Sequence, residues 1–468
     1  MTSTNPSSGT GTTPAEAESA GGGVPPQSPP DPSGTAPSSP TGGKSAKQRS
    51  VLFRNRAFAL VWGGESISLL GSEISVVALP LLAVIGFGEG AVGVGMLIAA
   101  QWIPFVLLAP LMGVFTDRLS RRMMMQVANA ARFIVIGSLP LAWALDGLTL
   151  VHLYVAALVK GVFDVVFQLA YQAYLPQLLA REDLVDGNAK TQLSRSVALI
   201  FGRSAGGALV SALGAARALA VDAVSYLLAA VALSFVRFRE PEKQQTHARG
   251  LRATLVDLRG GVTMTFGNKL LRYLTLMATF GNTAVSMVLA MIIVFGYEDL
   301  GLTAAQVGLT LGLGGAPVVV GAILSRRINE RLGIGRTLLL THSMLVVAFA
   351  LLPLAQLGGT GFAVTVLIIS QGISSFTTPV GNVGVMTLIQ KATPPQAMGR
   401  VGGVSLPLVW GANAAGPLLG SAVAVTINNT AAFYLASALA LCAVLWVLAG
   451  SVTRLTDDVP EDMRLVVD

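Results

Sequence analysis

Twelve long apolar segments follow one another along the chain, and they limit what it can fold into more than any other feature. They lie at about 58–85, 91–115, 123–145, 149–175, 194–214, 216–236, 270–296, 304–324, 336–356, 361–388, 400–423 and 431–450. Each is long enough to cross the hydrocarbon core of a bilayer as an α-helix, which takes about 20 residues. Charged residues form only 12% of the chain, about half the share usual in soluble domains. The sequence therefore predicts an all-α membrane protein with twelve transmembrane helices.

Basic residues between the apolar segments indicate how the chain is oriented. If the N-terminus is inside, the inner loops hold twenty Lys and Arg residues, whereas the outer loops hold only Arg217. Because short loops rich in Lys and Arg stay on the cytoplasmic side, we expect both termini in the cytoplasm. Abundant Ala, Gly and Val, with more Arg than Lys, are typical of a GC-rich bacterial genome, so we expect the bacterial inner (plasma) membrane. Bases spread over short loops form no single basic face, which argues against a nucleic-acid partner.

The widest gap between segments divides the twelve six and six. The sequence predicts, in order, a disordered cytoplasmic tail (1–50), an N-terminal six-helix bundle (51–236), a cytoplasmic central loop (237–269), a C-terminal six-helix bundle (270–450) and a cytoplasmic tail (451–468). The halves repeat one another, since Gly113 and Arg118 at the end of the second segment match Gly321 and Arg326 at the end of the eighth in register. Such repetition is typical of transporters whose substrate site lies between the halves near the bilayer centre.

Three stretches of the chain resemble signatures of one membrane protein family. Gly113-Val-Phe-Thr-Asp117-Arg118-Leu-Ser-Arg121-Arg122 resembles motif A of the major facilitator superfamily (MFS). "EISVVALP", from residue 73, resembles the first-helix motif of its drug exporters. "YLPQLLAREDLVDGNAKTQLSRSV" and the glycine-rich fifth segment are similar to the branch that holds macrolide efflux proteins and the enterobactin exporter. The resemblance, over about residues 51–450, implies the MFS fold of two six-helix halves related by a pseudo-two-fold axis.

The resemblance also implies a function and a latch, and the chain departs from the family pattern at two positions. It implies proton-coupled efflux of a small amphipathic molecule, such as a drug, antibiotic, siderophore or other metabolite. It further implies that motif A latches the outward-open state against the helix that begins near Arg400, through Gly113, Asp117, Arg118, Arg121 and Arg122. The alternative for the three arginines is a role as topological anchors alone. Arg203 stands where the family's fifth helix carries proline, and Lys160-Gly161 replaces the arginine motif of the fourth.

Polar residues on four segments share single helix faces. Polar stripes in spanning helices must face protein or a water-filled cavity. The candidates for a substrate cavity are Ser72, Gln168, Tyr171, Asn282, Ser286, Gln371 and Ser374. They lie on the first, fourth, seventh and tenth segments, which line the central cavity in the resembled fold. The alternative for any single Ser or Thr is helix–helix hydrogen bonding, and the glycines at 202, 206, 207, 416 and 420 are predicted to be close-packing surfaces.

Seven charged residues lie inside the predicted spans, away from the basic residues at the span ends that are counted with the loops. The acids are Glu65, Glu73, Asp164 and Asp222, and the bases are Arg132, Lys160 and Arg203. A charge at the bilayer centre costs roughly 2.5–3.5 kcal/mol, so we expect pairing, with Lys160 four residues before Asp164 and Arg203 beside Glu73 or Asp164. Four acids and three bases leave one carboxylate without a basic partner. We predict a proton-coupling network of Glu65, Glu73, Lys160, Asp164 and Arg203 with Glu73 or Asp164 as the proton-exchanging group; a static locking network is the alternative.

Few residues suit other kinds of chemistry. The chain has one Cys and three His, which argues against a disulfide framework, a metal site or a cofactor. His152 and His342 are expected at or near helix ends, and no Ser/His/Asp set or HExxH motif is present, so an enzyme is not expected. The favoured interpretation is a monomeric secondary exporter driven by the proton gradient. The alternatives are an importer or facilitator of the same fold and, less favoured, a transport-inactive scaffold or sensor.

Overall fold

The computed structural model describes the backbone of residues 51–238, 251–449, 460 and 463–465. Side chains are described for these residues except 53, 109–118, 181 and 251–257. The described chain is helical throughout, without strands, and contains twelve helical runs long and apolar enough to cross a membrane. The predicted fold class and number of spans are therefore confirmed. The predicted tail at 1–50 lies outside the described residues.

The first half of the chain supplies six of these spans. Its elements are α1 (Val51–Arg54), α2 (Arg56–Leu81), η1 (Leu82–Gly86), α3 (Ala91–Arg118), α4 (Arg121–Ala144), α5 (Leu150–Leu178), η2 (Arg181–Asp183), α6 (Leu184–Val197), η3 (Ala198–Gly202), α7 (Arg203–Leu213) and α8 (Ala215–Ser234). Polar caps begin several of them, because a side-chain oxygen satisfies an otherwise unpaired backbone N–H group. Asn55 accepts from Phe58 N at α2, and Thr149 accepts from His152 N at α5. Gly214, with φ +87°, makes the sharp turn between α7 and α8.

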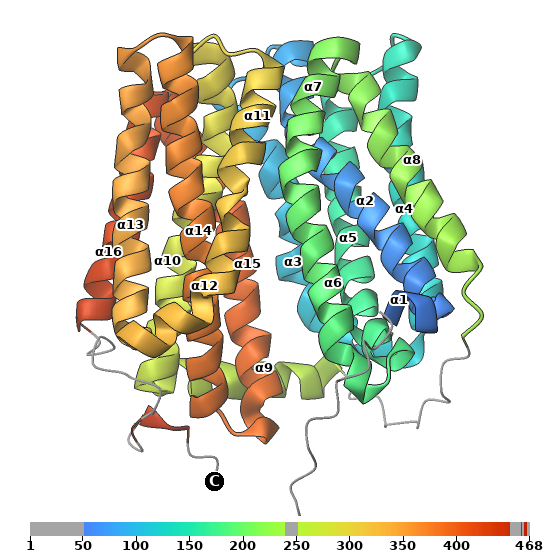
Figure 1. Ribbon diagram of the computed structural model, residues 1–468, viewed down its shortest axis with the longest axis vertical. Coiled ribbons are helices and arrows are strands. Elements are labelled where there is room, and N and C mark those ends of the chain that lie inside the picture. Colours follow the sequence, from blue (N-terminus) through green and yellow to red (C-terminus); the bar gives the residue numbers. More distant parts are fainter. Residues whose placement is uncertain (1–50, 239–250, 450–459, 461–462, 466–468) are drawn as a thin grey trace, which may run out of the picture. The chain divides into compact units, whose positions relative to one another are not determined.

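The second half supplies the other six spans and one additional helix. Its elements are α9 (Leu251–Gly267), α10 (Lys269–Val294), η4 (Phe295–Asp299), α11 (Ala304–Gly315), α12 (Pro317–Leu332), α13 (Ile334–Leu351), η5 (Leu352–Leu357), α14 (Thr360–Ala392), α15 (Pro395–Thr426) and α16 (Asn429–Ala449). Helix α9 lies across one end of the bundle (Figure 1) and packs on α15. A Cβ atom at Gly261 would lie 2.3 Å from the Arg400 carbonyl oxygen, so glycine allows this approach.

The two halves repeat one another in the register of their first spans. Helix α2 has 26 residues and runs into the five-residue π-helix η1. Helix α10 likewise has 26 residues and runs into the five-residue π-helix η4. Because π-helical turns are rare, the same turn at the same distance from the helix start is a specific sign of the internal repeat.

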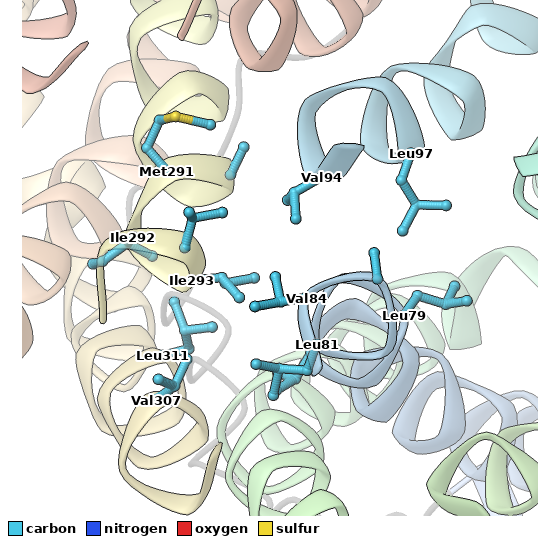
Figure 2. Close-up of a cluster of buried hydrophobic side chains, with 14 of the residues drawn as sticks. Leu79, Leu81, Val84, Val94, Leu97, Met291, Ile292, Ile293, Val307 and Leu311 are labelled. Carbon is cyan, nitrogen blue, oxygen red and sulfur yellow. The ribbon is translucent and has the colours of Figure 1, made fainter. Parts of the chain in front are cut away.

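The apolar core joins the two halves at one end of the described bundle, which is termed the closed end. Leu79, Leu81 and Val94 of the first half share one cluster with Met291 and Val307 of the second, and each is at most 2% exposed. Figure 2 shows these side chains converging from α2, α3, α10 and α11. A continuous, close-packed apolar core of this kind seals the interface between the halves at this end.

At the opposite end, termed the open end, the described residues form a separate core in each half. One cluster holds Phe58, Val165 and Leu178 of the first half. The other holds Leu274 and Val401 of the second half. The halves therefore share a hydrophobic core at the closed end, and each half has its own at the open end.

Glycines bring the halves into backbone contact toward the closed end, where α7 packs on α11. A Cβ atom at Gly207 would lie 2.3 Å from the Ala304 carbonyl oxygen and 2.7 Å from Gly308 Cα. A Cβ atom at Gly95 on α3 would lie 2.7 Å from Ser421 Oγ on α15. The prediction that Gly207 is a close-packing residue is confirmed, and Gly202, Gly206, Gly416 and Gly420 also contact neighbouring helices within 3.0 Å of such a Cβ position.

Candidate functional site

Arg203 forms an ion pair inside the first half. It is the first residue of α7, directly after the π-helix η3, and its Nε lies 2.7 Å from Glu73 Oε2 on α2. The two side chains are 14% and 22% exposed. Gly202 allows α2 to come this close, because a Cβ atom there would lie 2.6 Å from Glu73 Cβ. Of the two acids predicted as partners of Arg203, the structure pairs it with Glu73.

Asp164 on α5 binds two bases. Its Oδ2 lies 2.7 Å from Lys160 Nζ, one helical turn away as predicted, and its Oδ1 lies 3.1 Å from an Arg132 nitrogen on α4. Arg132 also donates to Asn129, and its guanidinium lies 4.2 Å from the centre of the Phe167 ring. Such a guanidinium is held by charge, hydrogen bonding and cation–π attraction together.

Two of the four acids predicted inside the spans form no ion pair among the described residues. Asp222 is fully buried and accepts a hydrogen bond from Ser75. Glu65 is 8% exposed; its Oε2 is buried and has no hydrogen-bond partner in the described part of the chain. Arg132 and Arg195 act on Glu65 electrostatically without pairing with it. Because Asp164 binds two of the three bases, two carboxylates rather than the one expected lack a basic partner.

Several of the seven residues predicted for a substrate cavity form hydrogen bonds with neighbouring groups. Ser72 is hydrogen-bonded to Tyr226 Oη (2.8 Å), Tyr171 Oη lies 3.4 Å from Thr191 Oγ1, and Ser286 donates to backbone carbonyls of α10 and α15. Gln371 and Ser374 are buried, and Gln168 is half-buried. Only Asn282 lines a cavity described below. Helix–helix hydrogen bonding therefore accounts for Ser72 and Ser286, and a substrate role for the set stays a prediction.

An apolar cavity of about 400 Å³ lies between the two halves. Leu169 of α5 contributes from the first half, and Met386, Met398 and Trp410 contribute from α14 and α15. Trp410 stacks edge-on against Phe105 of α3 at 5.6 Å between ring centres. An aromatic contact between the halves thus lies at one wall of this cavity.

A smaller cavity, of about 80 Å³, lies inside the second half between α10, α13 and α14. His342 lines it and is 8% exposed. The expectation that His342 lies near a helix end is wrong, because α13 begins after Gly333 and places His342 near the middle of the helix. His152 does lie in the first turn of α5, with Nε2 2.9 Å from Ser138 Oγ.

The structure covers only part of the predicted latch. The backbone of α3 is helical through Arg118, but the side chains of Gly113, Asp117 and Arg118 lie outside the described residues. Arg122 donates to the Ser234 carbonyl at the end of α8, at 2.8 Å. Among the described residues, no group of three or more His, Cys, Asp or Glu side chains could hold a metal ion.

Residues 61–412 match the sequence profile of the Major Facilitator Superfamily. The chain belongs to the major facilitator superfamily. MFS-type transporters are among its relatives: YfiS of Bacillus subtilis, uncharacterized, is 23% identical over 89% of the chain and 97% of its own length. Macrolide efflux protein A of Streptococcus pyogenes is 23% identical over 82% of the chain and 93% of its own length. The protein is therefore a multi-pass membrane transporter of the MFS.

Solved transporter structures share its fold. A bacterial homologue of the iron transporter ferroportin, in an inward-facing state, superposes with a TM-score of 0.70 at 17% identity, over 85% of this chain and 98% of that one. The nucleoside transporter NupG gives a TM-score of 0.68 at 11% identity, over 84% of this chain and 99% of that one. At these identities the likeness concerns the fold alone.

Proposed function

We propose that this MFS protein exports a small amphipathic molecule by alternating access, driven by the proton gradient. The observation that carries the proposal is the asymmetry of the apolar core, which joins the halves at the closed end and is separate in each half at the open end. A transporter with its site between two halves must be sealed on one side at a time. The basic loops flank the open end, so by the positive-inside rule the open end faces the cytoplasm.

The apolar cavity between the halves supports an amphipathic substrate. Its volume of about 400 Å³ falls in the range of pockets for drug-sized molecules, about 300–1,000 Å³. Met386 and Met398 adapt to differently shaped apolar surfaces, and Trp410 offers a flat face with one polar atom. Similarity to macrolide efflux protein A supports the same substrate class.

The test of function uses purified protein in proteoliposomes and radiolabelled erythromycin, a macrolide, as the probe. An exporter that exchanges protons should accumulate erythromycin in vesicles with the cytoplasmic face outward and an acidic lumen. Equilibration without accumulation would instead indicate a facilitator, and accumulation only under the opposite gradient would indicate an importer. Absence of any movement, for erythromycin and for a panel of amphipathic drugs, would count against export of such molecules.

Glu65 is the carboxylate best placed to exchange the coupling proton. Glu73 and Asp164, the two carboxylates that the sequence favours, are held in ion pairs, whereas Glu65 is buried without a hydrogen bond on Oε2. A buried carboxylate without a partner is more stable protonated. Glu65→Gln mimics that form, so it should abolish gradient-driven accumulation of erythromycin while labelled and unlabelled erythromycin still exchange without a gradient.

The matched variants separate coupling from folding. Glu73→Gln and Asp164→Asn leave buried bases without their partner and should reduce both gradient-driven accumulation and exchange. Glu330→Gln removes one side of an exposed ion pair with Arg326 and should change neither. If Glu65→Gln still accumulates erythromycin and only the Glu73 or Asp164 variant loses the gradient dependence, the proton exchanges at that residue instead.

A further inference from the structure

The cavity inside the second half occupies the place where the first half holds two charged side chains, Glu65 and Arg132, and two aromatic rings. Counted from the first residue of each helix, Ala278, Leu345, Thr377 and Gly381 of α10, α13 and α14 correspond to Glu65, Arg132, Phe167 and Tyr171 of α2, α4 and α5. All four residues of the second half line the cavity. Charged and aromatic side chains fill this position in one half, and smaller, uncharged ones leave it hollow in the other.

His342 presents a bare nitrogen to this cavity. Its Nδ1 lies 2.9 Å from the Leu338 carbonyl oxygen, which can only accept, so Nδ1 carries the proton of the neutral imidazole. Nε2 therefore has a free lone pair and makes no hydrogen bond with any described residue. Gly281 faces it across the cavity, and a Cβ atom there would lie 3.1 Å from Nε2. The imidazole thus offers a hydrogen-bond acceptor in a space that glycine keeps open.

Five other polar side chains line the cavity, from Asn282, Thr341, Thr377, Thr378 and Asn382. Asn282 donates one amide hydrogen to the Ala278 carbonyl (2.8 Å), so its Oδ1 and its second amide hydrogen stay available. Thr341 donates its hydroxyl proton to the Leu338 carbonyl (3.1 Å), and Thr377 donates to the Ser374 carbonyl (3.0 Å). Their protons are used within their own helices, and their oxygen lone pairs remain. The residues that line the cavity include no Asp, Glu, Lys or Arg.

We propose that this cavity is a subsite that binds an uncharged hydrogen-bond donor, a hydroxyl or amide N–H group, of the transported molecule. The chemistry of the cavity matches such a group, because His342 Nε2 is an acceptor without a hydrogen-bond partner among the described residues and no charged side chain lines the cavity. A volume of about 80 Å³ exceeds the roughly 10–15 Å³ needed for one water but is far below that of a drug-sized pocket. The cavity therefore accommodates a small group and not a whole drug. The subsite rests on the proposed function, since it serves the transported molecule.

The test measures whether donors reach His342 in the full-length protein in lipid nanodiscs. Diethylpyrocarbonate modifies an imidazole nitrogen that has a free lone pair, and peptide mass spectrometry separates His342 from the other two histidines. The probes are ethylene glycol, which has two donors, and 1,2-dimethoxyethane, which has the same skeleton and none. Ethylene glycol should slow modification of His342 severalfold, and 1,2-dimethoxyethane at equal concentration should not. His152, whose Nε2 already has a partner, serves as the internal control.

Two glycine variants and two salts test whether the protection of His342 arises in this cavity. Gly281→Ala puts a methyl group against Nε2 and should remove the protection by ethylene glycol. Gly361→Ala, in the first turn of α14 with nothing within 4 Å of the added Cβ atom, should retain it. Three results would overturn the subsite. They are equal protection of His342 by both probes, protection of His342 by NaCl but not by KCl, and a His342 that does not react with diethylpyrocarbonate in the folded protein. Erythromycin transport without donor-specific protection would leave the proposed function standing and remove the subsite; protection without transport would do the reverse.

Discussion

Arg203→Leu is expected to lower the free energy of unfolding by about 3 kcal/mol, because it leaves the Glu73 carboxylate inside the membrane without its cation. Removing one partner of a buried ion pair costs roughly 3–5 kcal/mol. The lower end applies here since 22% of the Glu73 side chain remains exposed. Equilibrium unfolding of the purified protein in mixed micelles measures the change, and erythromycin transport should fall with it.

A double-mutant cycle isolates the pair itself. Glu73→Gln combined with Arg203→Leu removes both charges and should be more stable than Arg203→Leu alone, with a coupling of roughly 1–3 kcal/mol. Arg326→Leu is the matched control, because its ion pair with Glu330 is similarly short but its side chain is 86% exposed, so it should leave stability almost unchanged. Additive losses in the cycle would show that the two charges act independently.

Leucine is a better replacement here than the proline that resembling exporters carry. The backbone N–H of Arg203 donates to the Ile200 carbonyl at the end of η3. Proline lacks that donor, so Arg203→Pro changes both the charge and the π-helical turn. If Arg203→Pro nevertheless transports normally, the ion pair is not required for the transport cycle.

The pairing within one helix could be predicted from the sequence, whereas pairings between helices could at most be narrowed to two candidates, as for Arg203 with Glu73 or Asp164. Lys160 and Asp164 are one turn apart, so their contact follows from helical geometry. Arg132 reaches Asp164 from another helix, 32 residues away in sequence, and Ser75 reaches Asp222 over 147 residues. Such contacts depend on which helices are neighbours and how they are rotated, and hydropathy specifies neither. The sequence consequently predicted one acid without a basic partner, whereas the structure has two among its described residues.

The number of spans and the division into halves followed from segment length and spacing, whereas the cavities depend on side-chain volume in three dimensions. The polar stripes identified Asn282, but they gave no signal for Trp410 or for His342. For His342 the difference is a shift of helix bounds: the predicted segment began at 336, whereas Gly333, with φ +79°, starts α13 earlier and Pro353 lies in η5, which ends it. With these bounds His342 is the ninth of the 18 residues of α13, near the middle of the helix.

Gly207→Leu is expected to abolish transport without unfolding the protein, because it acts on one state of the cycle. At the closed end, a Cβ atom at Gly207 would lie 2.3 Å from the Ala304 carbonyl oxygen. That oxygen is a backbone atom, so it cannot rotate away as a side chain could. Overpacking of this kind costs roughly 1–3 kcal/mol. The cost falls on the state in which α7 and α11 touch, so the population should shift about 5- to 150-fold toward a state with this end open.

Cysteine labelling measures that shift directly. In a Cys442→Ser background, which removes the single native cysteine, Val307→Cys reports on the closed end, because Val307 is 2% exposed in the sealed core. Gly207→Leu should raise its rate of labelling by a membrane-impermeant maleimide by about the same 5- to 150-fold, while Gly361→Leu, where an added Cβ atom meets nothing within 4 Å, should not. Lost transport with unchanged labelling would mean that the α7–α11 contact does not govern opening. Raised labelling with normal transport would mean that this seal is not needed in the cycle, which would contradict alternating access through this end.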